Sequence, residues 1–233
     1  MTNLESSRAV SPLAAFSTAT ISDALDKLGR PGSMLGIAPL TDDVRVCGRA
    51  FTVRYVTGGH PVGTVGDYLD DVEPGRVVVL DNQGRTDCTV WGDILTAMAH
   101  ARGVGGTVID GVCRDVERAL GNGYPIYSRG RFMRTGKDRV EVAEVGGAVS
   151  IGGVNVKNGQ LLVGDADGVL AVPLDLEAEV LEIASGIHER EERIVEAVLA
   201  GSTIAEARRA QGYHTLQRAS QDPSEAAGSA LGS

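Results

Sequence analysis

The chain has 233 residues, which is ample for one domain with a substantial apolar core and short for two. Its formal net charge of −9 leaves no excess of basic residues to neutralise phosphates, so we expect no nucleic-acid partner. The 31 glycines and the 4% of aromatic residues are typical of an α/β protein of short strands and tight turns, and they argue against a helical bundle.

The cysteines and the apolar runs bear on the cellular compartment. Cys47, Cys88 and Cys113 form no C-x-x-C pair, which excludes a zinc ribbon and fits a reducing compartment. Residues 1–15 lack the basic start and apolar core of a signal peptide, and no run of 18 apolar residues occurs. We therefore expect a cytoplasmic protein with no membrane partner.

The first predicted helix covers residues 21–28 and follows an N-terminal arm, residues 1–17. Thr20 and Asp23 have the spacing of an acidic capping box, and Gly29 ends the helical pattern. Alternating apolar and polar positions over 44–56 then predict one or two strands.

The glycine-rich segment 57–66 leads into the central part of the chain. It could be a mobile wall of a site or a flexible crossover. A lone histidine in a loop, such as His60, more often has no specific role than a functional one. Residues 67–72 are compatible with a short helix. The continuous apolar run 77–80 predicts a strand that ends at Asp81.

The segment from Trp91 to Asp115 is the most informative of the chain. A helical apolar pattern follows Gly92 and predicts a helix over 93–102. Residues 106–110 predict a buried strand. Ten helical residues rise about 15 Å, and five extended residues return about 17 Å. Packed side by side, the two elements would bring the strand exit level with the first turn of the helix.

This geometry would place Arg114 and Asp115 beside Asp93 and the unpaired N–H groups of residues 92–95. A guanidinium, two carboxylates and a helix N-terminus in one place can hold an organic anion and a divalent metal ion. The alternative is that Asp93 only offsets the helix dipole and that Arg114 and Asp115 form an exposed turn.

Short elements are expected to follow: a helix at 116–122, a strand at 125–127 and several strands within 140–172. Between them, residues 129–139 form a basic loop that includes Lys137. This loop is either solvated or a rim that steers an acidic substrate.

Residues 174–200 predict the longest helix, with an apolar stripe of Leu176, Val180, Ile183, Ile187, Ile194 and Val198. Glu191 falls on that stripe. It therefore needs a partner, water or a metal ion, unless the helix has left the core by then. Residues 202–233 are expected to hold a short helix, capped at Thr203, and a disordered tail.

Collinear blocks between residues 18 and 200 resemble the RraA-like proteins. They are T-A-T-I-S-D-A-L at 18–25, G-R-A-F-T-V at 48–53, P-G-R-V-V-V-L-D at 74–81 and I-G-G-V-N-V at 151–156. The aldolase members of that family carry an aspartate, twenty intervening residues and then Arg-Asp, which here are Asp93, Arg114 and Asp115. The resemblance implies a swivelling β/β/α fold of the α/β class, a single domain over 18–201 with a long C-terminal helix.

The resemblance implies a role for each residue of this motif. Asp115 would bind Mg²⁺ or Mn²⁺ directly, with water molecules filling most of the coordination shell. Arg114 would bind the keto-acid end of the substrate. Asp93 would order a metal-bound water that handles protons.

Further roles come from the helix start and from a second subunit. The backbone N–H groups of Gly92, Ile94 and Leu95 would receive the substrate carboxylate. The family forms trimers or pairs of trimers, so Glu191 of a neighbouring copy, or Glu192, would approach the metal through water.

The implied activity is cleavage of 4-hydroxy-2-oxo diacids, such as 4-hydroxy-4-methyl-2-oxoglutarate or 4-carboxy-4-hydroxy-2-oxoadipate, to pyruvate and a second keto acid. Oxaloacetate decarboxylation is the implied side activity. Cleavage leaves a pyruvate enolate, whose oxygen needs a positive neighbour. Because Lys27, Lys137 and Lys157 lie in polar or loop settings, a metal ion is a better candidate than a Schiff base.

Two alternatives are open. Family members that inhibit ribonuclease E are non-catalytic and lack the full aspartate set, which Asp93 and Asp115 supply here. The segment 57–68 and the C-terminal tail match the family poorly, and Asn158-Gly159-Gln160 replaces its usual Pro-Gly-Asp turn. The second alternative is therefore a family lyase with a different keto-acid substrate.

Overall fold

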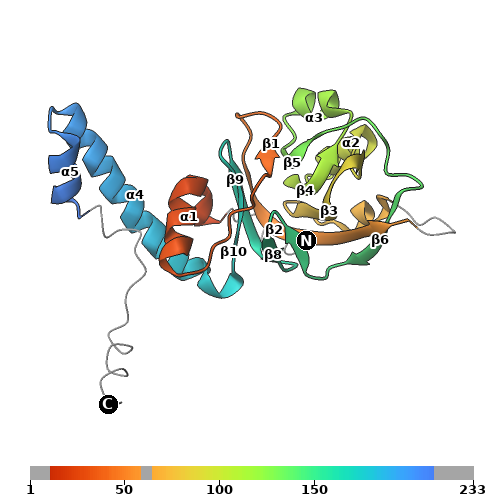
Figure 1. The fold of residues 1–233 in the computed structure, drawn as a ribbon, viewed down its shortest axis with the longest axis horizontal. Helices are drawn as coiled ribbons and strands as arrows, with labels where there is room; N and C mark the ends of the chain where they lie inside the picture. Colours follow the sequence, from red (N-terminus) through yellow and green to blue (C-terminus); the bar gives the residue numbers. More distant parts are fainter. Residues whose placement is uncertain (1–10, 59–64, 213–233) are drawn as a thin grey trace, which may run out of the picture.

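The computed structural model describes residues 11–58 and 65–212. Its framework is a mixed sheet in the strand order β1-β5-β4-β3-β2-β9-β10, to which β6 adds by pairing with β2 (Figure 1). The strands are β1 (Ala38–Pro39), β2 (Val46–Thr57), β3 (Val77–Thr89), β4 (Gly106–Cys113), β5 (Ile126–Arg131), β6 (Val140–Val145), β9 (Leu161–Asp165) and β10 (Gly168–Val172), with a separate hairpin of β7 (Val149–Ile151) and β8 (Val154–Val156). His60 and the predicted tail beyond residue 212 lie outside the described residues.

The helices connect these strands and extend the chain at its end. They are α1 (Thr18–Lys27), α2 (Asp93–Ala101), α3 (Val116–Asn122), α4 (Glu177–Leu199) and α5 (Ile204–Ala210), with 3₁₀ turns η1 (Pro12–Ala15), η2 (Asp67–Asp71) and η3 (Leu174–Leu176). The predicted α/β class with a long C-terminal helix is therefore confirmed. Within the described residues, no helix is long and apolar enough to cross a bilayer.

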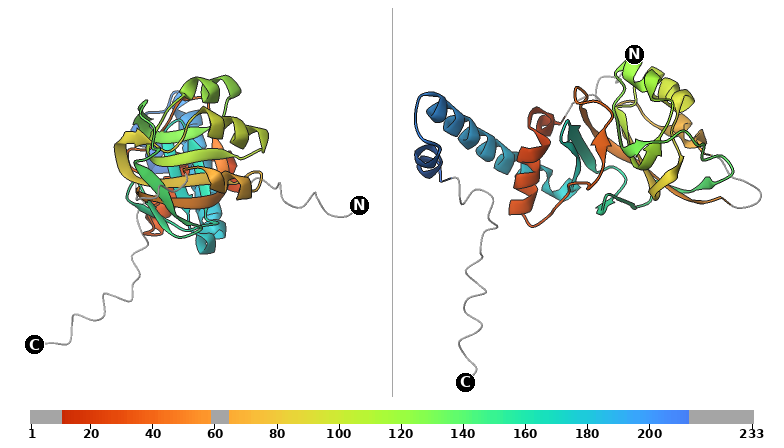
Figure 2. Two further views of the ribbon diagram at one scale, coloured as in Figure 1. Left: turned by 90° about the vertical axis from the view of Figure 1, so that its right-hand side faces the viewer. Right: turned by 45° about the horizontal axis from the view of Figure 1, so that its top comes forward.

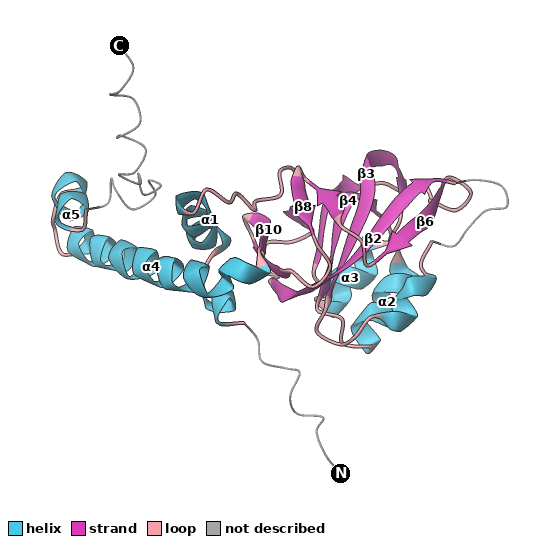
Figure 3. Ribbon diagram, turned by 90° about the horizontal axis from the view of Figure 1, so that it is seen from below, coloured by secondary structure: helices cyan, strands magenta, loops and turns pink. Residues whose placement is uncertain are grey.

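Strands β2 to β5 are parallel, and both faces of this parallel part are covered. Helices α2 and α3 lie on one face, where Leu80 and Ile109 of the strands pack with Trp91 and Ala99 (Figure 3). The β7–β8 hairpin covers the other face through its own apolar cluster. Continuous apolar runs such as 77–80 are what a strand buried on both faces requires.

β2 joins two parts of the molecule because its two halves pair with different strands. Val46–Arg49 pair with β9, and Ala50–Arg54 pair with β3. Beyond β9 and β10, α1 and the first half of α4 form a third apolar cluster, which includes Ile21, Leu25 and Ala184. The remainder of α4 continues away from the sheet to α5, at the opposite end of the long axis from α2 and α3 (Figure 2).

Two strands extend beyond the ends that the sequence predicted for them. The strand expected to end at Asp81 continues to Thr89, because β3 keeps pairing with β4 through two register shifts. Gln83 and Gly84, with φ of 57° and 69°, make the first of these irregularities. β4 likewise extends to Cys113 rather than stopping at residue 110.

The capping box predicted at Thr20 for the first helix was wrong, because the helix begins about one turn earlier. α1 begins at Thr18, and its cap is Ser17, whose Oγ accepts a hydrogen bond of 3.1 Å from the backbone N–H of Thr20. Asp165 at the end of β9 accepts from both the N–H and the hydroxyl of Thr18, at 2.8 and 2.6 Å. A tertiary partner that the local pattern does not reveal therefore sets the helix start. The capping box predicted at Thr203 is present.

Candidate active site

The exit of β4 and the start of α2 meet, as the matching lengths of helix and strand predicted. The backbone N–H of Arg114 donates a hydrogen bond of 3.0 Å to the carbonyl of Trp91, one residue before the helix cap Gly92. This bond fixes the segment after β4 directly against the segment before α2. The structure therefore brings Asp93, Arg114 and Asp115 together.

Gly92 allows an unusually close approach between these segments. A β-carbon at this position would lie 2.9 Å from Oδ2 of Asp115 and 3.4 Å from Nε of Arg114. The backbone of Gly92 is extended, so the glycine is needed here for space and not for a special conformation. The carboxylate of Asp115 consequently rests against the N-terminus of α2.

Asp115 has a left-handed backbone, with φ of 53° and ψ of 39°. It stands at the cap position of α3, yet its side chain makes no capping hydrogen bond. Its nearest cation is Arg114, whose Nε is 3.2 Å from Oδ2, and both side chains are about two-fifths exposed. A non-glycine residue held in this region is a pointer to function, and here its carboxylate is directed to α2 rather than to its own helix.

The start of α2 offers free donors. Gly92 provides no side-chain cap, so the first N–H groups of the helix, including those of Ile94 and Leu95, lack the side-chain acceptor that usually satisfies one of them. Asp93, in the first turn, lies 3.9 Å from Arg118 of α3, and its side chain is 44% exposed. The helix start thus combines open donors with an accessible carboxylate.

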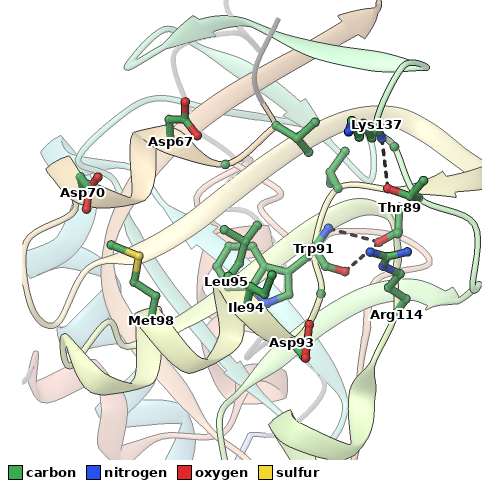
Figure 4. A pocket seen from close by; sticks show the side chains of 16 residues that line it. Asp67, Asp70, Thr89, Trp91, Asp93, Ile94, Leu95, Met98, Arg114 and Lys137 are labelled. Carbon is green, nitrogen blue, oxygen red and sulfur yellow. Dashed lines mark hydrogen bonds between the residues drawn. The ribbon is translucent and has the colours of Figure 1, made fainter.

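Asp93, Arg114 and the start of α2 border a pocket of about 570 Å³ (Figure 4), and Asp115 lies against Gly92 at its edge without being among the described lining residues. One end of the pocket is formed by the start of α2, Arg114 and the turn around Thr135 and Lys137. The other end lies between the flank of α2, at Leu95 and Met98, and η2, at Asp67 and Asp70 (Figure 4). A volume of this size is typical of sites for small organic ligands.

Trp91 supports the wall of the pocket, a role that the sequence did not predict. Its indole N–H donates to the hydroxyl of Thr96 at 2.9 Å, and its ring stacks on Tyr124 at an interplanar angle of 4°. The Thr96 hydroxyl in turn donates to the carbonyl of Gly92 at 2.9 Å. The one tryptophan of the chain, next to the helix cap, was the available signal.

The predicted basic loop divides into two parts. Arg129 belongs to β5 and pairs with the buried carboxylate of Asp110, so it does not line the pocket. Lys137 does line it, on a turn held in place where the carbonyl of Arg134 accepts a 3.0 Å hydrogen bond from the N–H of Thr89. One basic residue of the loop, Lys137, therefore has the position that a substrate-steering rim requires.

The donors at this site suit a hard divalent cation. Asp115 and Asp93 supply accessible carboxylate oxygens. Among residues 11–58 and 65–212, no group of three or more histidine, cysteine or acidic side chains could enclose a metal ion. A zinc site needs three or four such ligands, whereas Mg²⁺ retains several waters and binds through one or two carboxylates. Two accessible carboxylates are donors that Mg²⁺ or Mn²⁺ can use.

Glu191 and Glu192 lie on α4, which runs away from the sheet on the side opposite α2, where the pocket lies (Figure 1). Burial raises the pKa of Glu191 above its usual value, and the nearby carboxylate of Asp23 raises it further. Glu192 is exposed. Its position on the apolar stripe thus leaves Glu191 partly desolvated. This lies between the two alternatives that the sequence allowed, a carboxylate in the core that needs a partner and a carboxylate in solvent.

The protein-family model described as RraA-like: Aldolase/RraA matches residues 18–171. A Legionella pneumophila protein named DlpA is 40% identical over 82% of this chain, but the match spans only 32% of that longer protein. A Halalkalibacterium halodurans relative named "Putative 4-hydroxy-4-methyl-2-oxoglutarate aldolase" is 37% identical over 72% of this chain and 77% of its own length.

Solved structures share the fold. An uncharacterized Pseudomonas syringae protein is 43% identical, with a TM-score of 0.78 over 84% of this chain and 94% of that one. Streptomyces coelicolor RraAS2, described as an unusual member of the RNase ES inhibitor RraA protein family, is 30% identical, with a TM-score of 0.70 over 77% of this chain and 91% of that one.

Proposed function

This chain belongs to the RraA-like family, and we propose that it is a divalent-metal-dependent lyase that cleaves 4-hydroxy-2-oxo diacids to pyruvate and a second keto acid. Relatives named as 4-hydroxy-4-methyl-2-oxoglutarate aldolases support this reaction class. The observation that carries the proposal is the contact of the Asp115 carboxylate with the open N-terminus of α2, beside Arg114.

Substrate binding in this proposal uses the positive groups at the start of α2. The N–H groups of Gly92, Ile94 and Leu95 donate to the carboxylate next to the keto group, where the helix dipole adds favourable charge. Arg114 donates to the same end of the substrate, which orients the keto oxygen toward Asp115.

Cleavage then breaks the bond between C3 and C4. The proton of the C4 hydroxyl passes through water to Asp93, the C4 oxygen becomes a carbonyl, and the bonding electrons move onto pyruvate as its enolate. Protonation of C3 completes the release of pyruvate. Asp93 fits this role because its carboxylate is accessible at the pocket and adjacent to the helix start.

Asp115 would hold the divalent cation, with Glu191 of a neighbouring copy contributing through water in a trimer or pair of trimers. When bound, Mg²⁺ or Mn²⁺ would supply positive charge beside the developing enolate oxygen. Since decarboxylation of oxaloacetate yields the same enolate, we propose it as a side activity.

The proposal is tested by following pyruvate through lactate dehydrogenase and NADH oxidation. The panel contains 4-hydroxy-4-methyl-2-oxoglutarate, related 4-hydroxy-2-oxo diacids and oxaloacetate, each with Mg²⁺ and with EDTA. We expect metal-dependent pyruvate release that Asp115→Ala abolishes, while Asp175→Ala, which changes an exposed aspartate away from the pocket, leaves it intact. Equal rates for wild type and Asp115→Ala would overturn the proposal.

A second function is favoured by the likeness to RraAS2, whose description names ribonuclease inhibition. Absence of activity on the whole panel, together with tight binding to a purified ribonuclease, would support such a regulatory function instead.

A further inference from the structure

We propose that the end of the pocket away from Arg114 selects the substituent on C4 of the substrate, and that it favours an uncharged apolar group over one bearing a carboxylate. The inference rests on the proposed function and narrows its substrate class. It follows from an unequal distribution of charge along the pocket.

Among the described residues, the two cationic side chains that line the pocket are at one end. Arg114 and Lys137 lie on the same side in Figure 4, whereas Asp67, Asp70 and Met98 lie on the opposite side. A diacid anchored at the start of α2 can therefore keep both of its carboxylates near Arg114 and Lys137. Its remaining C4 substituent then points to the other end.

That other end has an apolar floor. Leu95 and Met98 project from the flank of α2, and Val65, from the segment before η2, also lines the pocket. All three are partly buried and pack against the main apolar cluster. Gly66 lies so close to Leu95 that a β-carbon would be 2.6 Å from its Cδ2, so the segment before η2 is in direct contact with the flank of α2.

The rim of this end is acidic. Asp67 and Asp70 line the pocket there, and the cation that binds Asp70, Arg102, is not among the lining residues. A carboxylate placed against Leu95 and Met98 would lose hydration and face the negative charge of Asp67, whereas the charge of Asp70 is offset by its ion pair with Arg102. An alkyl group would move from water to an apolar surface, which is favourable.

The test measures kcat/KM for three substrates that differ only at C4: 4-hydroxy-2-oxoglutarate with hydrogen, its 4-methyl derivative, and its 4-carboxymethyl derivative, 4-carboxy-4-hydroxy-2-oxoadipate. We expect the methyl compound to exceed the hydrogen compound about fourfold, which corresponds to about 0.8 kcal/mol per buried carbon. The carboxymethyl compound should be the poorest of the three.

Variants of Met98 locate the effect. Met98→Gln, of similar length but polar, should bring the methyl-to-hydrogen ratio close to one. Met98→Lys should shift the carboxymethyl-to-methyl ratio about fivefold toward the carboxymethyl compound, as a partly exposed charge pair allows. Met133→Lys is the matched control, because Met133 is 76% exposed and outside the pocket.

The outcomes separate this inference from the proposed function. If no substrate is cleaved, the proposed function fails. If all three are cleaved with equal kcat/KM, or if Met98→Lys and Met133→Lys shift the ratios equally, the inference fails while the lyase activity stands. Ratios between substrates are informative here because a general loss of folded protein would lower all three rates together.

Discussion

A β-carbon added to Gly92 would lie 2.9 Å from Oδ2 of Asp115, a separation that real structures essentially never show. The contacted atom is the end of a side chain, which can swing away without disturbing the backbone. We therefore predict that Gly92→Ala folds with a nearly unchanged melting temperature and loses about a hundredfold in kcat/KM, since small displacements of catalytic groups have effects of that size. Pyruvate release and thermal unfolding measure the two quantities, and an active Gly92→Ala enzyme would contradict the prediction.

The left-handed backbone of Asp115 predicts unequal stabilities for two variants that both lack its carboxylate. Glycine adopts φ of 53° without strain, whereas alanine does not. Asp115→Gly should therefore be more stable than Asp115→Ala by about 1 kcal/mol, while both are inactive. Urea unfolding of the two variants measures the difference. Equal stability would show that the strain is absent.

Thr96 should be a positioning residue because its hydroxyl joins the Trp91 indole to the carbonyl of Gly92. Thr96→Val keeps the shape and leaves the buried indole N–H without a partner, which costs about 1–3 kcal/mol of unfolding free energy. Trp91→Phe removes that donor, so the double variant should be less destabilised than the sum of the singles. Additive losses in the double-mutant cycle would exclude coupling through this hydrogen bond.

Stability in acid should depend on Asp165. Its burial acts to raise the pKa, but hydrogen bonds from Thr18 and from the backbone of Asp167 outweigh this and hold the pKa below its usual value of 3.8. A lowered pKa means that the ionised carboxylate favours the folded state, so its contribution is present above pH 3.8 and is lost as the pH falls through and below that value. Asp165→Asn should therefore be less stable than wild type at pH 7 and approach it below pH 4, in urea unfolding measured across pH. Asp167→Asn, which keeps the backbone donor, is the control, and a pH-independent difference for Asp165→Asn would contradict the assignment.

The sequence predicted the elements whose patterns are local and repetitive. The helix at 116–122 and the convergence of Asp93 with Arg114 followed from periodicity and element length alone. Strand ends were missed where pairing continues through irregular backbone, as at Gln83. The start of α1 was missed because a partner 147 residues away, Asp165, fixes it.

The pocket was less predictable from the sequence than the motif of Asp93, Arg114 and Asp115. The residues that line it include Met98 and Val65. Met98 lies on a helix face whose apolar pattern is typical of ordinary core packing. Val65 follows a segment without a clear sequence pattern. Neither residue carries chemistry that a sequence would single out. Which apolar side chains face a cavity depends on how η2 packs against α2, and periodicity does not encode that packing.

The last prediction concerns Glu191, which lies on α4, away from α2 and the pocket of its own chain, and which we propose serves the pocket of another copy. Glu191→Ala should therefore weaken Mg²⁺ activation, and mixing Asp115→Ala with Glu191→Ala subunits should restore activity. In mixed oligomers some sites combine an intact Asp115 from one copy with an intact Glu191 from its neighbour. We expect pyruvate release at limiting Mg²⁺ to exceed that of either variant alone, after subunits are exchanged by joint refolding. Activity no higher than the average of the two variants, with mixed oligomers present, would show that the site is not shared.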